Sequence, residues 1–237
     1  MAQYGFDLHI HSCLSPCAEN SSQPAVMAGM FALSGFKIAA LTDHNSSSNC
    51  AAFLKACEFY GILGIPGMEL NTSEEVHVVC LFKTLEGAME FSDTVYKSLP
   101  DIKNRSNIFG QQLFADAEGN VTGEEEKLLI SASGIGIYQA KALAESCGGI
   151  AYPAHIDRSS NSLLSNLGMW DPDMGFSLAE LSMACPEGFT DTRKDLKGLR
   201  TIRGSDAHRI EQIPLSPGQF MDLPELSTDA VFEWLRK

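Results

Sequence analysis

The chain has only six histidines in 237 residues, and two of them lie two positions apart in the stretch "DLHIHS". Alternate residues of a β-strand point to the same side, so Asp7, His9 and His11 are predicted to share one face of a strand. Two imidazoles on one face can hold a single metal ion. Asp7 is predicted to accept a hydrogen bond from a ligating ring, which would fix the orientation of that ring, rather than to bind the ion.

The other histidines also lie near predicted carboxyl ends of apolar, strand-like stretches, each close to an Asp or Glu. They are His44 in "LTDHN", His77 in "EEVHVV", His155 in "YPAHID" and His208 in "GSDAH". One such histidine would most simply be a hydrogen-bonded core or surface residue. Six in this arrangement favour a metal site instead, and Glu69 at the end of "GIPGMEL" is a further candidate ligand.

Strand-like and helix-like stretches alternate along the chain. Strands are predicted at 4–11, 37–45, 62–70, 74–82, 150–157, 175–183 and 199–208, and helices at 24–36, 46–61, 84–100, 134–149 and 226–237. This alternation predicts parallel βαβ units, arranged as an open sheet or a barrel. No glycine-rich nucleotide loop follows the first strand, which weakens the open-sheet alternative.

A closed α/β barrel fits the pattern of polar residues better. Ligands from six separate segments can meet in one place where the carboxyl ends of barrel strands converge. Residues 101–132 are less regular, with the turn-like "AEGNVTGEEEK". They are predicted to be a small insertion or cap within a single domain that spans residues 1–237.

Charge and cysteine content restrict the partners and the compartment. Lys and Arg total 17 against 30 Asp and Glu, and the net charge of −13 argues against binding an extended nucleic-acid duplex. Bound divalent cations would still attract a small anionic substrate. The seven cysteines include no CxxC pair and are predicted to be reduced thiols. With no secretory leader and no long apolar segment in the sequence, a cytoplasmic protein without a membrane partner is expected.

The ordered set "DLHIHS", "LTDHN", "GMEL", "VHVV", "PAHID" and "GSDAH" resembles the successive motifs of the polymerase and histidinol phosphatase (PHP) family of metal-dependent phosphoesterases. The resemblance implies a distorted (β/α)7 barrel with two or three divalent ions, usually zinc, manganese or iron. It places His9, His11, Glu69 and Asp206 around the first ion. It also implies that Glu69, Asp206 and His208 are catalytic.

The same resemblance implies the remaining metal ligands. Glu69 would bridge to a second ion held by His77 and His155, and a third ion would be held by His44 and His208. Asp43 would contact a ligand or bind an ion only occasionally.

One position departs from the family pattern. Many relatives use a further histidine for the third ion in the loop after the HxH pair, and no histidine lies between His11 and His44 here. Cys17 occupies about that place. A thiolate is a competent ligand for zinc, although a buried thiol beside a two-metal site is the alternative.

The chemistry expected of such a site is hydrolysis of a phosphoester bond, in which a metal-activated hydroxide attacks phosphorus. The substrate would be a small phosphorylated metabolite, a nucleotide or an oligonucleotide end. Arg158 and Arg209 are predicted to bind phosphate oxygens, although either could be a surface ion pair. Two alternatives remain open, hydrolysis of a C–N bond as in amidohydrolases and a metal-binding regulatory module without turnover.

Overall fold

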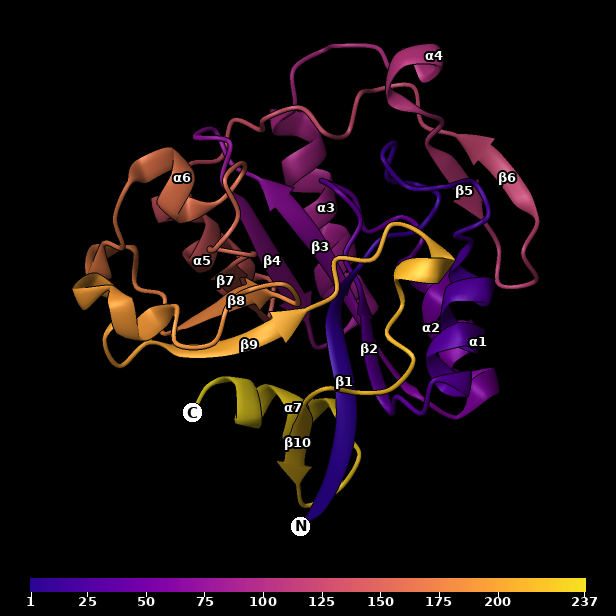
Figure 1. Ribbon diagram of the computed structural model, residues 1–237. Helices are drawn as coiled ribbons and strands as arrows, with labels where there is room; N and C mark the ends of the chain where they lie inside the picture. The colour runs from indigo at the N-terminus through magenta and orange to yellow at the C-terminus, as the bar shows by residue number, and fades with distance from the viewer.

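The computed structural model describes residues 1–237, in which strands and helices alternate over most of the chain (Figure 1). The strands are β1 (Ala2–Ile10), β2 (Ile38–Leu41), β3 (Leu63–Asn71), β4 (His77–Phe82), β5 (Leu113–Ala115), β6 (Val121–Glu124), β7 (Gly149–Pro153), β8 (Leu178–Ser182), β9 (Arg200–Gly204) and β10 (Phe220–Leu223). The α-helices are α1 (Pro24–Leu33), α2 (Cys50–Tyr60), α3 (Leu85–Ser98), α4 (Ser106–Phe109), α5 (Ile137–Ser146), α6 (Leu163–Leu167) and α7 (Thr228–Leu235). All predicted strands and helices are present. The short elements α4, α6, β5, β6 and β10 have no clear signal in the sequence.

Local sequence signals explain where several helices begin and end. Pro24 opens α1, where its missing N–H costs nothing. The side chains of Thr84 and Ser227 accept hydrogen bonds from backbone N–H groups in the first turns of α3 and α7. Gly61 ends α2 in the left-handed conformation, with φ 69°, which glycine adopts without steric cost.

Seven strands form the wall of a distorted barrel in the order β1-β2-β3-β4-β7-β8-β9. Strands β1 to β4 and β7 belong to one strongly curled sheet, to which β10 is added beside β1, while β8 and β9 pair separately. Backbone hydrogen bonds of 2.9 Å near the strand ends connect these two parts, from Ile156 N–H to the Glu180 carbonyl and from His11 N–H to the Ala207 carbonyl. The expectation of a distorted α/β barrel is therefore confirmed.

The expectation that all strands run parallel is wrong for β4, which is antiparallel to both β3 and β7. A short turn joins β3 to β4, and their register sets Asn71 opposite His77. His77 therefore begins its strand instead of lying near the carboxyl end. The reversed direction of β4 nevertheless carries His77 to the barrel end where β1, β2 and β3 finish.

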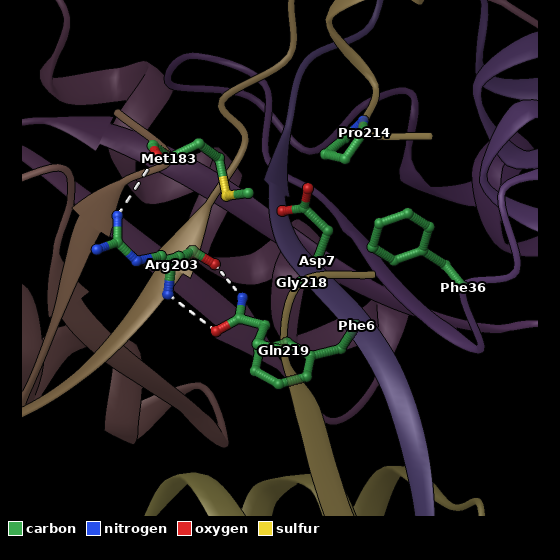
Figure 2. A pocket seen from close by; sticks show the side chains of 8 residues that line it. All are labelled: Phe6, Asp7, Phe36, Met183, Arg203, Pro214, Gly218 and Gln219. Carbon is green, nitrogen blue, oxygen red and sulfur yellow. Dashed lines mark hydrogen bonds between the residues drawn. The ribbon is translucent and has the colours of Figure 1, made fainter. Parts of the chain in front are cut away.

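The contact between β1 and β9 is incomplete along their length, and a small pocket lies at this seam (Figure 2). Gln219, just before β10, covers the edge of β9 there. Its side-chain oxygen accepts a 3.0 Å hydrogen bond from Arg203 N–H, and its side-chain nitrogen donates to the Arg203 carbonyl. One side-chain amide thus satisfies the backbone groups that a neighbouring strand would otherwise bind.

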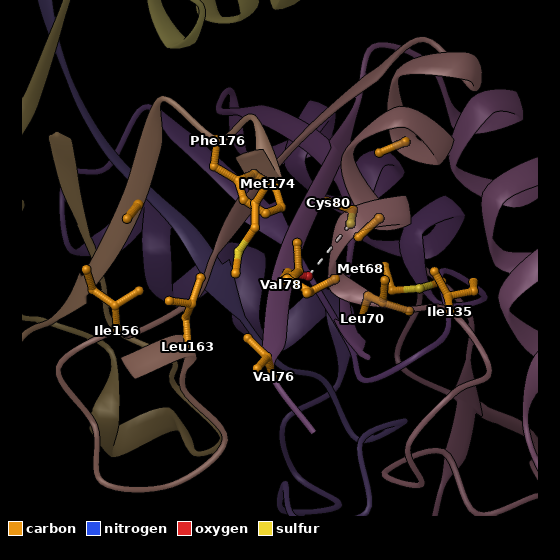
Figure 3. Packing of buried hydrophobic residues seen from close by; sticks show 14 of the residues in the cluster. Met68, Leu70, Val76, Val78, Cys80, Ile135, Ile156, Leu163, Met174 and Phe176 are labelled. Carbon is orange, nitrogen blue, oxygen red and sulfur yellow. Dashed lines mark hydrogen bonds between the residues drawn. The ribbon is translucent and has the colours of Figure 1, made fainter. Parts of the chain in front are cut away.

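Two hydrophobic layers enclose the barrel wall between them. On β4, Val78 and Cys80 face outward into a cluster that α3 and α5 cover, and Figure 3 shows part of this cluster. Val79 and Leu81 face the barrel interior. Phe232 of α7 belongs to the same interior cluster, and α7 lies across the barrel end that carries the chain termini (Figure 1). The opposite end is left for polar residues.

Residues 101–132 include α4 and the β5–β6 hairpin, and they pack against the loop that follows β1. Leu113 N–H donates a 2.8 Å hydrogen bond to the Cys13 carbonyl, and the Asn49 side chain donates to the Leu113 carbonyl at 3.1 Å. Gly110, with φ 98°, lies so close to the loop that a Cβ there would be 2.0 Å from the Pro16 carbonyl oxygen. This region therefore supports the loop from outside.

No helix in the structure has both the length and the apolar character needed to cross a membrane. All seven cysteines are unpaired, as predicted.

Candidate metal centre

Glu69, near the end of β3, is the centre of the polar end of the barrel. Its side chain is fully buried, and nitrogen atoms of five imidazoles lie 2.9–3.3 Å from its two carboxylate oxygens. Oε1 faces His9, His77 and His155, whereas Oε2 faces His11 and His44. The two oxygens of one carboxylate are thus presented to different sets of nitrogens, which is the arrangement a bridging ligand requires.

Three overlapping groups of side-chain atoms are close enough to hold an ion. They are His9, His11, Glu69 and Asp206; His44, Glu69 and His77; and His11, His44 and His208. In the first group the Nε2 atoms of His9 and His11 lie 3.3 and 2.9 Å from Asp206 Oδ1. Atoms bound to one ion at about 2.0–2.2 Å lie roughly 3.0–3.5 Å from one another, so the spacing fits a shared metal ion.

The hydrogen bonds made by the Nδ1 atoms of His9 and His11 are also compatible with a bound cation. His9 Nδ1 lies 2.8 Å from the Glu180 carboxylate, which can only accept, and His11 Nδ1 lies 2.9 Å from Ser15 Oγ, whose own hydrogen is donated to Asp43. Both rings therefore use Nδ1–H as a donor and turn an Nε2 lone pair inward. These two Nε2 atoms are 3.2 Å apart, a distance at which lone pairs repel unless a proton or a metal ion lies between them.

Several buried polar atoms of the cluster have no hydrogen-bond partner. They are His44 Nδ1, Glu69 Oε2, His155 Nδ1 and Asp206 Oδ1. His44 Nδ1 and Glu69 Oε2 are 3.0 Å apart, yet neither is in hydrogen-bond geometry. Unpaired polar atoms are rare in protein interiors, and three of the four belong to His44, Glu69 and Asp206, side chains of the ligand groups described above. The residues therefore fit multiple divalent ions.

Electrostatics favour positive charge at the centre of the cluster. Burial by itself would lower the pKa of His9, but the charges of Glu180, Glu69 and Asp206 raise that pKa well above its ordinary value. Hydrogen bonds to Asp206 and Glu69 likewise outweigh burial and raise the pKa of His11 to about 9. Despite burial, the surrounding imidazoles hold the pKa of both Glu69 and Asp206 well below the usual range.

The outer histidines behave in the opposite way. Burial lowers the pKa of His44 to about 4, and burial together with the charge of His11 lowers that of His208 to about 3. His208 Nδ1 donates to the Asp206 carbonyl at 2.8 Å, which leaves its Nε2 lone pair free. Both rings are therefore neutral near pH 7, the state in which imidazole binds metals.

The predicted role of Asp7 is wrong. The register between β1 and β2 shifts between Asp7 and Ile10, where β1 contains one residue more than its partner. Such a bulge interrupts the strict alternation of sides, so Asp7 does not share the face of His9. Its carboxylate instead accepts hydrogen bonds from the N–H groups of His9 and Ser205, and it lines the seam pocket (Figure 2). Burial raises its pKa to about 7.

Asp43 contacts the ligands indirectly. Its buried carboxylate accepts hydrogen bonds from the backbone N–H and the hydroxyl of Ser12 and from the hydroxyl of Ser15, at 2.6–2.7 Å. Ser15 in turn accepts from His11 Nδ1 and from the N–H of His44. Asp43 belongs to none of the three groups of clustered ligand atoms.

Cys17 also lies outside the three groups, on an exposed part of the loop after β1. Although the residue is exposed to solvent, neighbouring protein atoms partly desolvate the thiol, and this desolvation followed by the charges of Glu69, Asp206 and Asp43 raises its pKa to about 12. The thiol thus lies within range of the cluster's negative charges without joining its ligand atoms.

The two predicted phosphate-binding arginines lie in different places. Arg158 Nη1 is 2.5 Å from Asp206 Oδ2, and the Arg158 side chain is 43% exposed, so it reaches from solvent to the cluster. Arg209 is 57% exposed and lies 3.3 Å from the carboxylate of Glu19. The structure brings Arg158 to the metal centre and pairs Arg209 with a surface acid.

Sequence reasoning missed Glu180 and the hydroxyl of Ser15 as groups that hold the imidazoles. The available signal for Glu180 was a single acid inside the apolar stretch "SLAELS". Asn161, whose side-chain amide lies 3.2 Å from His77 Nε2, had no such signal in "RSSNSL".

No family model matches the chain, and no curated protein is similar to it in sequence. Solved structures do match. The lesion-specific endonuclease EndoQ from Pyrococcus furiosus is 18% identical with a TM-score of 0.69, over 97% of this chain and 55% of that one. A structure of Endonuclease Q with a 27-mer duplex substrate that has an abasic lesion at the active site is 17% identical, with a TM-score of 0.72. This second match covers 99% of this chain and 57% of that one, so the chain spans a little over half the length of these endonucleases.

Two other solved structures match over nearly their whole length. A protein from Bifidobacterium adolescentis, described as a metal-dependent phosphoesterase, is 15% identical with a TM-score of 0.63, and the match covers 98% of this chain and 96% of that one. An amidohydrolase from Chromobacterium violaceum with bound sulfate is 20% identical with a TM-score of 0.62, over the same shares of the two chains.

Together with the strand order, these matches define the fold of the chain. The chain has a PHP-like fold, a distorted α/β barrel with a strongly curled mixed sheet, in common with the structure described as a metal-dependent phosphoesterase. Buried His, Glu and Asp clusters suited to divalent ions lie at the carboxyl end of that barrel.

Proposed function

We propose that the chain hydrolyses phosphoester bonds with two or three divalent ions, zinc, manganese or iron. The observation that carries this proposal is the convergence of five imidazoles on the fully buried carboxylate of Glu69. The proposed metal ligands are His9, His11, His44, Glu69, His77, His155, Asp206 and His208. Cys17 is proposed as an additional ligand of the ion that His44 and His208 hold.

The residues of the chain divide the work of such a site. Divalent ions held there would lower the pKa of a water molecule and stabilise negative charge on phosphoryl oxygens. Glu69 and Asp206 supply the negative charge that retains the cations in a buried place. Arg158, exposed on one side and paired with Asp206 on the other, is positioned to bind a substrate phosphate by its planar fork.

A small phosphorylated metabolite, a nucleotide or an oligonucleotide end is the proposed substrate. The net charge of −13 opposes a long duplex. The abasic duplex described for Endonuclease Q nevertheless makes a DNA lesion a substrate to be tested. We also propose that residues 101–132 are an insertion within one domain of residues 1–237, and that they border the site by supporting the loop that carries Ser15 and Cys17.

A substrate panel with the manganese-loaded protein tests the proposal. It contains phosphomonoesters, cyclic nucleotides, short single strands and a duplex with an abasic site, with amides included because of the match to an amidohydrolase. Glu69→Gln removes the central charge, and Glu58→Gln, an exposed acid on α2, is the matched control. Phosphoester turnover that Glu69→Gln abolishes and Glu58→Gln retains is the expected result. Equal background rates for wild type and Glu69→Gln on every phosphoester would reject the proposal, and turnover of amides alone would favour C–N hydrolysis.

A further inference from the structure

We propose that Glu180, on β8, is a positioning residue that fixes the ring of His9 and thereby sets the affinity of the centre for its metal ions. This inference rests on the proposed function, because it assumes that His9 binds an ion through Nε2. It concerns a residue that touches a ligand and not the ion itself.

The contacts of Glu180 determine which nitrogen of His9 faces the cluster. The side chain of Glu180 is fully buried, and its Oε1 lies 2.8 Å from His9 Nδ1. A carboxylate without a proton can only accept, so Nδ1 carries the hydrogen and Nε2 keeps its lone pair. That Nε2 atom lies 3.1 Å from Glu69 Oε1 and 3.3 Å from Asp206 Oδ1, inside the ligand cluster.

The same oxygen of Glu180 also contacts the backbone of a second candidate ligand. It accepts a hydrogen bond of 3.3 Å from the N–H of His155. His155 has φ 29°, an uncommon backbone conformation for a residue with a side chain, and its Nε2 lies 3.1 Å from Glu69. Glu180 therefore supports two of the imidazoles that face Glu69.

The barrel wall leaves Glu180 little freedom to move. Gly204, at the end of β9, lies against the carboxylate, and a Cβ at that position would be 2.3 Å from Glu180 Oε2. Oε2 is buried and has no hydrogen-bond partner. Burying a carboxylate with one unpaired oxygen opposes folding, and an apolar side chain would fill this part of β8 at lower cost. A role in holding His9 accounts for the acid.

His9 differs in this respect from the other rings whose Nδ1 is held. His11 Nδ1 contacts the neutral hydroxyl of Ser15, and His208 Nδ1 contacts the carbonyl of Asp206. His77 Nδ1 contacts Glu69, the carboxylate at the centre of the cluster, and its other nitrogen contacts the amide of Asn161. Among these rings, His9 alone has a carboxylate on the nitrogen that faces away from the cluster. A carboxylate acceptor makes an imidazole a stronger donor to a metal, so the loss of Glu180 should weaken metal binding more than the loss of a neutral acceptor.

The experiment measures binding of cobalt(II) to the metal-free protein by competition with a chelator, together with the visible absorption spectrum of the cobalt-loaded protein. Glu180→Gln keeps the shape and removes the charge, Glu180→Leu removes the acceptor, and Glu233→Gln, an exposed acid on α7, is the control. We expect the affinity to fall about 10- to 100-fold in Glu180→Gln and further in Glu180→Leu, with an altered cobalt spectrum. Glu233→Gln should match wild type in both readouts.

The outcomes separate this inference from the function on which it rests. If wild type binds no cobalt, the proposed function fails. If wild type binds cobalt and Glu180→Gln has the same affinity and spectrum, the role of Glu180 is refuted while the metal centre stands. If neither Glu180→Gln nor Glu180→Asp folds without metal, Glu180 is a structural residue and the inference is likewise overturned.

Discussion

Ser15 and Asp43 allow a direct test of how His11 is held. The hydroxyl of Ser15 accepts from His11 Nδ1 at 2.9 Å and from His44 N–H at 3.1 Å, and it donates to Asp43 Oδ1 at 2.7 Å. The hydroxyl thus uses its one donor and two acceptor sites fully. If Asp43 acts on the metal centre only through this hydroxyl, then Ser15→Ala and Asp43→Asn should weaken metal binding by the same route.

The expected magnitudes follow from these contacts. Losing the acceptor behind a ligating imidazole typically lowers metal affinity about 10- to 100-fold, which is about 1.4–2.7 kcal/mol. Each buried group that Ser15→Ala leaves unpaired should cost a further ~1–3 kcal/mol of folding free energy. The double variant should bind metal about as weakly as whichever single variant has the lower metal affinity. The two single effects would then fail to add, by a coupling energy of roughly 0.5–3 kcal/mol.

Competition titration of the four proteins with a metal chelator measures the affinities, and urea unfolding of the metal-free forms measures stability. Ser12→Ala is the matched control, because the Ser12 hydroxyl donates to Asp43 Oδ2 but does not contact His11. It should lower stability and leave metal affinity within a few-fold of wild type. Effects of Ser15→Ala and Asp43→Asn that add to within about 0.5 kcal/mol would refute the reasoning, because Asp43 would then act independently, for example as a ligand.

Three further predictions follow from the structure. The pKa of His11 is raised to about 9, so its proton stabilises the metal-free fold fully below pH 6.5 and progressively less up to pH 9. A metal ion must displace that proton, and also the proton that the raised pKa of His9 retains, so the apparent affinity in a chelator titration should rise at least about tenfold per pH unit from pH 7 to 9. A flat profile would contradict the protonation of His11. Arg158→Ala should raise KM for a phosphoester more than it lowers kcat. Arg209→Ala, at a surface ion pair, should change neither constant. If the two variants changed KM equally, Arg158 would have no special role in substrate binding. Gly110→Ala places a Cβ 2.0 Å from the Pro16 carbonyl at φ 98° and should lower the urea midpoint markedly, whereas Gly123→Ala on β6, whose Cβ would lie 3.4 Å from its nearest neighbour, should have a small effect.

The local pattern of the sequence predicts much of this molecule. Alternation of apolar strands with capped helices gives the elements, since Thr84, Gly61 and Ser227 mark helix boundaries through contacts within a few residues. The clustering of the histidines likewise follows from a general property of α/β barrels, whose strand ends meet at one place. Glu69 could be chosen as a candidate ligand for the same reason.

Long-range geometry decided the rest. The reversal of β4 set how His77 reaches the cluster, and a single extra residue in β1 separated Asp7 from the face of His9. Neither feature is visible in residue spacing, because a bulge and a strand direction depend on pairing with a neighbour distant in the chain.

The sequence alone determined the class of fold and the set of imidazoles and acids that gather at one end of the barrel, because these depend on residue type and short-range periodicity. Only the tertiary structure decided which group accepts the hydrogen bond from the nitrogen of each imidazole that faces away from the cluster. Glu180 meets His9 across 171 positions of sequence, and Asp43 reaches His11 through Ser15, because closing the barrel brings β8, β1 and the loop after β2 together.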